Sequence, residues 1–171
     1  MFRLIHANGT LKESHGRIVT GLRVFATVSL AFGVFVFLAD RFLAITGFEL
    51  LVGSFGAATA TLFLAPESPA VRPRSVLIAH LVGSSVGVCC RLALVPQFEG
   101  LAALVAVALT ISILTAFDAR HPPGGALALI AVIGPDDLLR EPVIFILTTG
   151  VLGPLLLLSI VTTVRRLTNA P

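Results

Sequence analysis

The chain consists largely of uncharged apolar runs, several of which are long enough to cross a lipid bilayer as helices. A bilayer core requires roughly 20 residues of helix, and such runs recur between residues 18 and 164. Only 12% of the residues are charged and 56% are hydrophobic, whereas soluble domains carry about 25% charged residues. A transmembrane β-barrel would show alternating apolar and polar residues, which these runs lack. The sequence therefore predicts an all-α, polytopic transmembrane helix bundle that forms a single domain.

Polar and proline-rich breaks divide the chain into a polar N-terminal segment and about six membrane segments. A break such as PESPAVRPR cannot lie inside a helix, because proline removes a backbone donor and clashes with the preceding turn. We expect a polar cytoplasmic segment over 1–17 and one transmembrane domain over 18–171. The expected membrane segments are 18–39, 43–65, 75–95, 101–117, 124–139 and 143–164.

The fifth segment is apolar for only about ten residues before Pro135, Asp136 and Asp137 interrupt it. Ten helical residues rise about 15 Å, half of a bilayer core, so the segment is either a short crossing or a re-entrant half-helix. With six crossings, nine of the 12 Lys and Arg residues lie on the side of both termini; a re-entrant segment lowers this number to seven. The positive-inside rule therefore favours six crossings, with both termini cytoplasmic in a multi-pass protein of the inner (plasma) membrane.

Two proline-rich breaks on the predicted cytoplasmic side resemble each other. In ESPAVRPRSVLIAH and DARHPPGGALALIA, an acid and a base precede a helix that starts directly after proline. This similarity predicts a weak parallel pseudo-repeat of helix pairs. Transporter folds often contain such repeats and bind their substrates at helix ends near the repeat interface.

The helix starts after these two breaks have the features of an anion-binding site. A helix N-terminus presents unpaired N–H groups and a partial positive charge, proline is tolerated there, and glycine lets backbone approach a ligand. Arginine adds charged, fork-shaped donors. The predicted anion-binding residues are Arg72, Arg74, Ser75, Arg120, His121, Gly124 and Gly125. The alternative is that proline and glycine only form turns and that the arginines only orient the chain.

The same residues carry a family resemblance. ESPAVRPRSVLIAHLVGSSVG, followed roughly forty residues later by HPPGGALALIAVIG, resembles the HPP family of integral membrane proteins over about residues 20–165. The family is named for its His-Pro-Pro motif, here His121, Pro122 and Pro123. Its members are thought to be small transporters, and plant plastid members are associated with nitrite transport. The resemblance thus implies transport activity without assigning site residues.

Three ionisable residues inside the predicted spans form a candidate pathway or ion pair: His80, Glu49 and Arg91. Such groups are costly in a membrane and usually face protein or a water-filled path. If the second and third spans are antiparallel neighbours, Glu49 and Arg91 lie at similar depths and pair. Small residues share the face of His80 and Arg91 in the third span and the face of Glu49 in the second, and these two faces predict a tight helix seam. They are Gly83, Ser84 and Gly87 in the third span and Gly53, Gly56 and Ala60 in the second. The seam is then either structural packing or a pathway wall in which His80 accepts protons or donates to an anion.

These patterns together predict a transporter or channel for a small inorganic anion, with nitrite as the first candidate. The alternative is a non-transporting membrane scaffold or sensor subunit. We expect no enzyme, because no nucleophile–base pair is visible, and no metal or cofactor, because zinc spacing and a Walker A motif are absent. The arginines lie at span ends, so we expect no nucleic-acid partner. The expected partners are the lipid bilayer, the small anion and further copies in a homo-oligomer, since glycine seams permit self-association.

Overall fold

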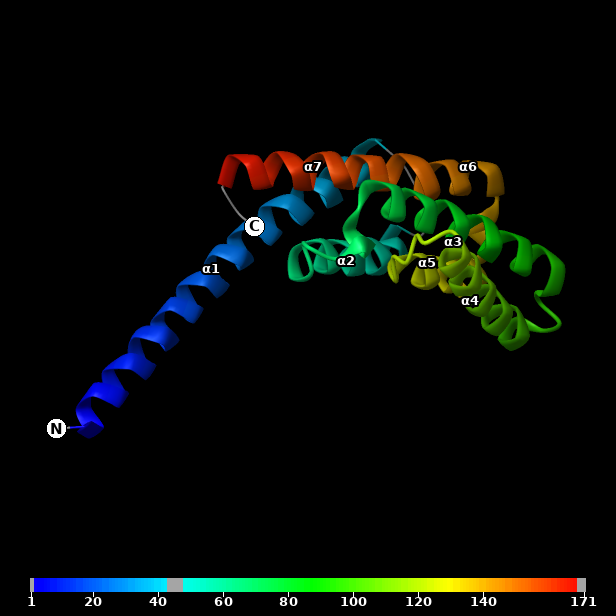
Figure 1. The fold of residues 1–171 in the computed structure, drawn as a ribbon. Coiled ribbons are helices and arrows are strands. Elements are labelled where there is room, and N and C mark those ends of the chain that lie inside the picture. Colours follow the sequence, from blue (N-terminus) through cyan, green and yellow to red (C-terminus); the bar gives the residue numbers. More distant parts are fainter. Residues whose placement is uncertain (1, 43–47, 169–171) are drawn as a thin grey trace.

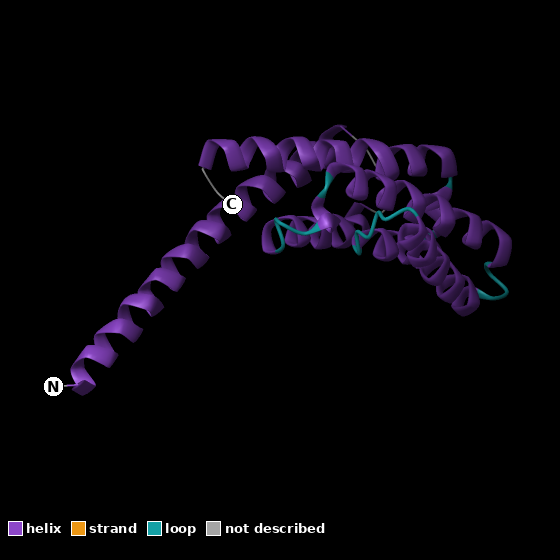
Figure 2. Ribbon diagram, in the orientation of Figure 1, coloured by secondary structure: helices purple, strands orange, loops and turns teal. Residues whose placement is uncertain are grey.

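The computed structural model describes residues 2–42 and 48–168, and these residues form helices, turns and short connections without any strand (Figure 2). The prediction of an all-α fold is confirmed. The helices are α1 (Phe2–Phe42), α2 (Phe48–Leu64), α3 (Pro73–Leu94), α4 (Glu99–Ala116), α5 (Pro123–Ile133), α6 (Pro142–Leu147) and α7 (Gly153–Thr168). The short turns are η1 (Pro69–Val71), η2 (Asp136–Leu139) and the π-helical η3 (Thr148–Leu152).

Four helical segments in the described part of the chain are long and apolar enough to cross a membrane. They are Gly16–Arg41, Pro73–Leu94, Glu99–Ala116 and Pro142–Thr168, which correspond to the first, third, fourth and sixth predicted segments. The second and fifth segments give shorter apolar helices, Gly53–Leu64 and Pro123–Ile133. The fifth helix ends at Ile133, before the expected limit at residue 139, because Pro135 follows and the chain turns into η2. The protein is therefore a multi-pass membrane protein with two short apolar helices.

Helix α3 lies at the centre of the bundle and contacts α4, α5, α6, η3 and α7 (Figure 1). The C-terminal part of α1 packs against α7 and α2, whereas its N-terminal part projects away from the other helices. Large apolar side chains on the outer faces of α1, α4 and α6 are exposed, as expected for surfaces that contact lipid acyl chains.

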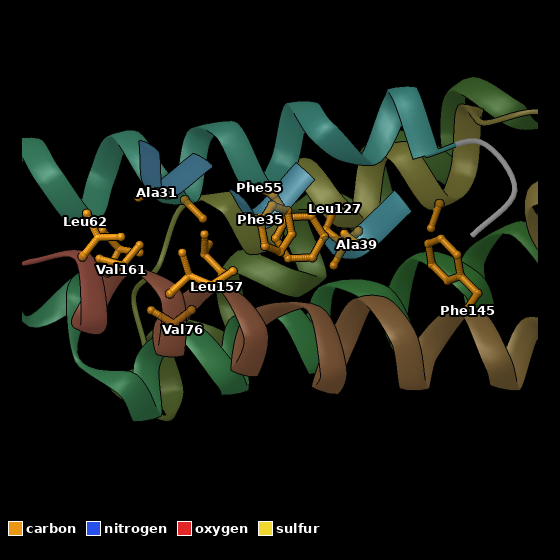
Figure 3. Close-up of a cluster of buried hydrophobic side chains, with 14 of the residues drawn as sticks. Ala31, Phe35, Ala39, Phe55, Leu62, Val76, Leu127, Phe145, Leu157 and Val161 are labelled. Atoms are coloured by element: carbon orange, nitrogen blue, oxygen red, sulfur yellow. The ribbon is translucent and has the colours of Figure 1, made fainter. Parts of the chain in front are cut away.

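The buried core lies where α1, α2, α5 and α7 meet. Phe35 from α1, Phe55 from α2 and Leu127 from α5 lie together in Figure 3 and are almost completely buried. Leu157 of α7 and Val76 of α3 belong to the same cluster. The α2 residues that enter this core come from a different helix face than the one expected to form the seam.

Helices α3 and α5 run in the same direction and pack through glycine. A Cβ atom on Gly83 would overlap the Gly124 carbonyl oxygen, and a Cβ atom on Gly87 would lie 2.6 Å from the Ala128 carbonyl oxygen. The contacts therefore advance together along both helices, and Arg91 reaches the end of α5 at Val132. This parallel arrangement places the two helix starts on one side, while the pseudo-repeat itself stays a prediction.

The last apolar segment is interrupted by the π-helical turn at Thr148–Leu152. Pro154 follows, and because it has no N–H group it cannot continue the regular helical ladder. A Cβ atom on Gly150 would lie 2.6 Å from Ser84 Oγ, and one on Gly153 would lie 2.5 Å from the Phe55 ring. The irregular turn thus lies against α3 and α2 close to the buried aromatic side chains.

Candidate functional site

A column of four buried rings connects four elements of the bundle. Phe35 of α1 lies against Phe55 of α2, with ring centroids 4.8 Å apart. Phe55 stacks on His80 of α3 at 5.1 Å, and His80 lies 5.5 Å from His121, in the 118–122 loop that precedes α5. Both histidine side chains are fully buried. The fold therefore joins two predicted site residues that are 41 positions apart in the sequence. The role of Phe55 was missed, because one phenylalanine in an apolar helix gives no distinguishing signal.

The hydrogen bonds of the two histidines determine their tautomers. His80 Nδ1 lies 2.9 Å from the Val76 carbonyl oxygen, and His121 Nδ1 lies 2.9 Å from the Ala70 carbonyl oxygen. A carbonyl oxygen only accepts hydrogen bonds, so each Nδ1 carries the proton and each neutral ring has an unprotonated Nε2. Among the described residues, neither buried Nε2 atom has a hydrogen-bond partner. An unsatisfied buried polar atom costs about 1–3 kcal/mol, so a pair of them in one place requires a physical explanation.

Tight turns hold the 118–122 loop inside the bundle. Asp118 adopts a left-handed backbone conformation with φ of 49°, and the Ala119 N–H returns to the Leu114 carbonyl. Ser54 of α2 donates from Oγ to the Pro123 carbonyl at 3.1 Å. Together with the bond from His121 to η1, these contacts show that the two proline-rich breaks meet in space.

The two glycines after the prolines have different surroundings. The Gly124 N–H donates to the His121 carbonyl, and a Cβ atom there would lie 2.5 Å from the Ala79 carbonyl oxygen. Gly124 therefore packs against α3, which corrects the expectation that it lets backbone approach a ligand. The Gly125 N–H is also engaged, by the Pro122 carbonyl. A side chain on Gly125 would first meet Ile111, at 3.9 Å, so this position faces open space.

That open space is a pocket of about 300 Å³ between α4 and the start of α5. Its lining is mainly apolar, with a guanidinium and an imidazole as its strongest polar groups. The lining residues are Ile111, Leu114, Thr115, Arg120, His121, Pro122 and Gly125. The Arg120 side chain is largely exposed and pairs with Asp118 at 3.7 Å. The pocket thus combines a positive charge at its rim with a buried imidazole in its wall.

The remaining predicted anion-binding residues do not join this pocket. Arg72 lines a separate pocket of about 390 Å³ together with Glu67 and Arg165. Arg74 is exposed, and the buried Ser75 hydroxyl donates to the Pro69 carbonyl at 3.0 Å. An anion contact of the backbone N–H group near Ser75 stays a prediction. The expected single basic cluster is therefore divided, with Arg120 at one pocket and Arg72 at the other.

Residues 13–171 match the family of HPP transmembrane regions. The chain belongs to the HPP family. Two curated proteins of Dictyostelium discoideum, both named only as transmembrane proteins, are similar to it. One relative is 39% identical over 92 residues, which cover 52% of this chain and 32% of the relative. The other is 41% identical over 90 residues, which cover 51% of this chain and 29% of the relative. The chain therefore spans about a third of the length of these relatives. No solved structure matches.

Arg91 of this HPP protein binds the C-terminal end of α5. Its guanidinium donates to the carbonyls of Val132, at 3.0 Å, and of Gly134, and it pairs with Asp136 Oδ1 at 2.7 Å. A cation at a helix C-terminus satisfies carbonyls that lack intrahelical donors and complements the helix dipole. The predicted partner Glu49 has a side chain outside the described ones, so that pair stays a prediction.

The small-residue face of α2 is not its packing face. Gly53 and Ala60 are exposed, whereas Ser54, Phe55 and Ala58 are buried. The expected seam is therefore wrong for α2, because the ring column and the bond from Ser54 to α5 determine which side of the helix faces inward. The predicted small-residue face of α3 does pack tightly, through Gly83 and Gly87, but against α5 and not against α2.

One arginine was interpreted only as a charge at the end of a span. Arg165 of α7 donates to the Leu62 carbonyl and lies over the Phe63 ring, 4.9 Å from its centroid. It therefore connects the C-terminal ends of α2 and α7. No sequence signal distinguishes it from the neighbouring Arg166.

Acidic pH is expected to destabilise the folded HPP protein through His121, which lies between α4 and α5. Burial lowers the pKa of His121 from 6.5 to about 4, although its bond to Ala70 opposes the shift. Because the unfolded chain takes up this proton first, the stabilisation is complete above pH 6.5 and is lost as the pH falls towards 4, by up to about 3 kcal/mol. Thermal unfolding in mild detergent between pH 7.5 and 4 measures this loss. The His121→Asn variant should lose less stability over the same range, and an equal loss would contradict the assignment.

Proposed function

We propose that this HPP-family protein is a transporter or channel for a small inorganic anion, with nitrite as the first candidate. The observation that carries the proposal is the pocket at the start of α5, where Arg120 and the buried His121 meet above Gly125. The pocket is large enough to admit a small ion, and Arg120 supplies a permanent positive charge. The relatives are named only as transmembrane proteins, so the choice of substrate rests on this pocket and on the family resemblance.

The depth of the pocket supports a transport role. Gly124 lies level with Ala79, six residues inside α3, so α5 starts about 9 Å deeper than α3 does. The pocket at the start of α5 therefore lies below the level at which α3 begins, on the side where the two helix starts lie. Transporters commonly bind anions at the starts of short or broken helices inside the membrane. The charge distribution favours both termini in the cytoplasm. The pocket then lies towards the cytoplasmic side of the inner (plasma) membrane.

Anion flux into proteoliposomes that contain only this protein tests the proposal. The Gly125→Val variant should lose most of the flux, because its side chain fills the pocket without changing the charge. The matched control is Gly100→Val near the start of α4, where a new side chain meets nothing within 4 Å. The Arg120→Gln variant should raise the half-saturating anion concentration by roughly fivefold, since an exposed ion pair contributes up to about 1 kcal/mol. Arg74→Gln serves as its control, because Arg74 lies outside the pocket.

Two outcomes would decide against the proposal. Parent-like flux in both Gly125→Val and Arg120→Gln would show that the pocket does not bind the anion. No flux of nitrite, nitrate, chloride or formate through correctly folded parent protein would favour the membrane scaffold or sensor subunit instead.

A further inference from the structure

The two buried histidines form a pair, of which His121 lines the pocket and His80 lies behind it. His80 and His121 come from different elements, and their ring centroids lie 5.5 Å apart. Each Nδ1–H group is held by a backbone carbonyl. Each Nε2 atom is buried, and no group among the described residues donates to it. The fold therefore keeps two proton acceptors side by side and supplies neither with a donor.

The surroundings of the pair limit it to a single additional proton. A proton on either Nε2 converts that atom from an acceptor into a donor. The Phe55 ring stacks on His80 and offers its face, which stabilises a cation. Burial disfavours a charged ring, so a proton on the pair needs a compensating negative charge nearby, and a second positive charge 5.5 Å away would be disfavoured further.

An anion in the pocket would make protonation of His121 more favourable. Among the described residues, the charged or titratable groups shown near His121 are Arg120 and its partner Asp118 on the same loop, and the neutral His80 on α3. From η1 the Ala70 carbonyl binds His121, while the uncharged Ser54 and Phe55 of α2 contact the neighbouring Pro123 carbonyl and His80. The positive charge of Arg120 repels a second positive charge on His121. An anion beside both side chains would reduce this repulsion. Anion binding and proton uptake therefore favour each other.

We infer that His80 and His121 form a proton-binding pair and that the anion crosses the membrane together with one proton. This inference rests on the proposed transport function. The proton comes from water on the side where the anion binds, bonds to an Nε2 atom, and returns to water where the anion leaves. No group is oxidised or reduced, and one negative and one positive charge move together, so the transport cycle is electroneutral.

Proteoliposomes with a clamped membrane potential test the inference. Nitrite or nitrate entry and internal pH are recorded together, and nitrate is included because nitric acid is too strong to cross lipid as the neutral acid. The parent protein should acidify the lumen by one proton per anion, at a rate that reversing the potential leaves unchanged. Protein-free vesicles define the leak.

Asparagine variants assign the proton to the pair. In His80→Asn and His121→Asn the amide N–H group can replace the Nδ1–H bond, but the side chain cannot be protonated. Each variant should lower protein-dependent proton uptake at least tenfold, while the same change at His15 of α1 should leave it unaltered. Unchanged proton uptake in both pair variants would overturn the assignment.

The failures of the two proposals are distinguishable. Anion entry that follows the potential without acidification would overturn proton coupling and leave anion transport intact. No anion entry at all would overturn both.

Nitrogen-15 NMR of the histidine-labelled parent protein adds a measurement that needs no variant to fold. At neutral pH without anion, His80 and His121 should show unprotonated Nε2 atoms. Saturating nitrite should protonate one of them, and two unchanged neutral rings would overturn the inference.

Discussion

Replacing Gly83 by alanine is expected to destabilise the bundle by about 1–3 kcal/mol or more, the range found when a packed core is overfilled. The new Cβ atom would overlap the Gly124 carbonyl oxygen, which is backbone and cannot rotate away. Helices α3 and α5 would have to separate, and the 118–122 loop at the start of α5 would move with them. Thermal unfolding in mild detergent, followed by helical circular dichroism, measures the loss.

The matched control is Gly33→Ala in α1, because an added Cβ atom there meets nothing within 4 Å. Alanine is the better helix former by roughly 0.5–1 kcal/mol in helix interiors. The control should therefore be neutral or stabilising, opposite in sign to Gly83→Ala. Equal stability of the two variants would show that α3 and α5 do not pack this closely.

Replacing Arg91 by glutamine is expected to cost about 3 kcal/mol, because charged hydrogen bonds contribute about 1.5–3 kcal/mol each. The change leaves the terminal carbonyls of α5, at Val132 and Gly134, without their guanidinium donor. Since α5 has only 11 residues, the loss of its C-terminal partner affects a large part of the helix. Equilibrium unfolding of the purified protein in mixed detergent micelles measures the change.

Asp136→Asn is the informative comparison for Arg91→Gln. The Asp136 side chain is fully exposed, so its removal should leave stability close to that of the parent, since exposed ion pairs contribute little. A loss as large as that of Arg91→Gln would show that the carboxylate, and not the helix end, is the main partner. Adding Glu49→Gln to each of these two variants tests the predicted pair of Glu49 and Arg91. If that pair exists, the stability losses of Glu49→Gln and Arg91→Gln should not be additive.

The general class of the fold follows from elementary properties of the chain. Backbone polar groups must be satisfied internally inside a bilayer, so solid apolar runs with few charges lead to helices. Proline-rich breaks set the helix starts at Pro73 and Pro123, because proline suits the first turn and no later one. The short fifth helix was predictable for the same reason, since Pro135 and two aspartates follow its apolar run.

Parts of the candidate site could also be predicted locally. The residues of the HPP motif identify the loop that holds His121, and Gly125 and Arg120 do line a pocket there. Their neighbours in sequence behave differently, since Gly124 packs on α3 and Ser75 bonds within its own turn. Adjacent residues point in different directions from a helix start. The rotation of α5 relative to α3 and α4 therefore decides which glycine packs against a helix and which one lines the pocket.

The sequence by itself therefore determined a helical, multi-pass membrane protein, the positions of its breaks and the loops that carry its polar residues, because these depend on local propensity and on the solvation of each segment. The tertiary structure alone decided that His80 meets His121, that Arg91 binds the end of α5, and that α2 turns Phe55 inward instead of its small residues. These pairings depend on the rotation and register of helices that are distant in sequence. Rotation and register are set by close packing around glycines and rings. The packing energy is distributed over many side chains, so no single sequence motif encodes it.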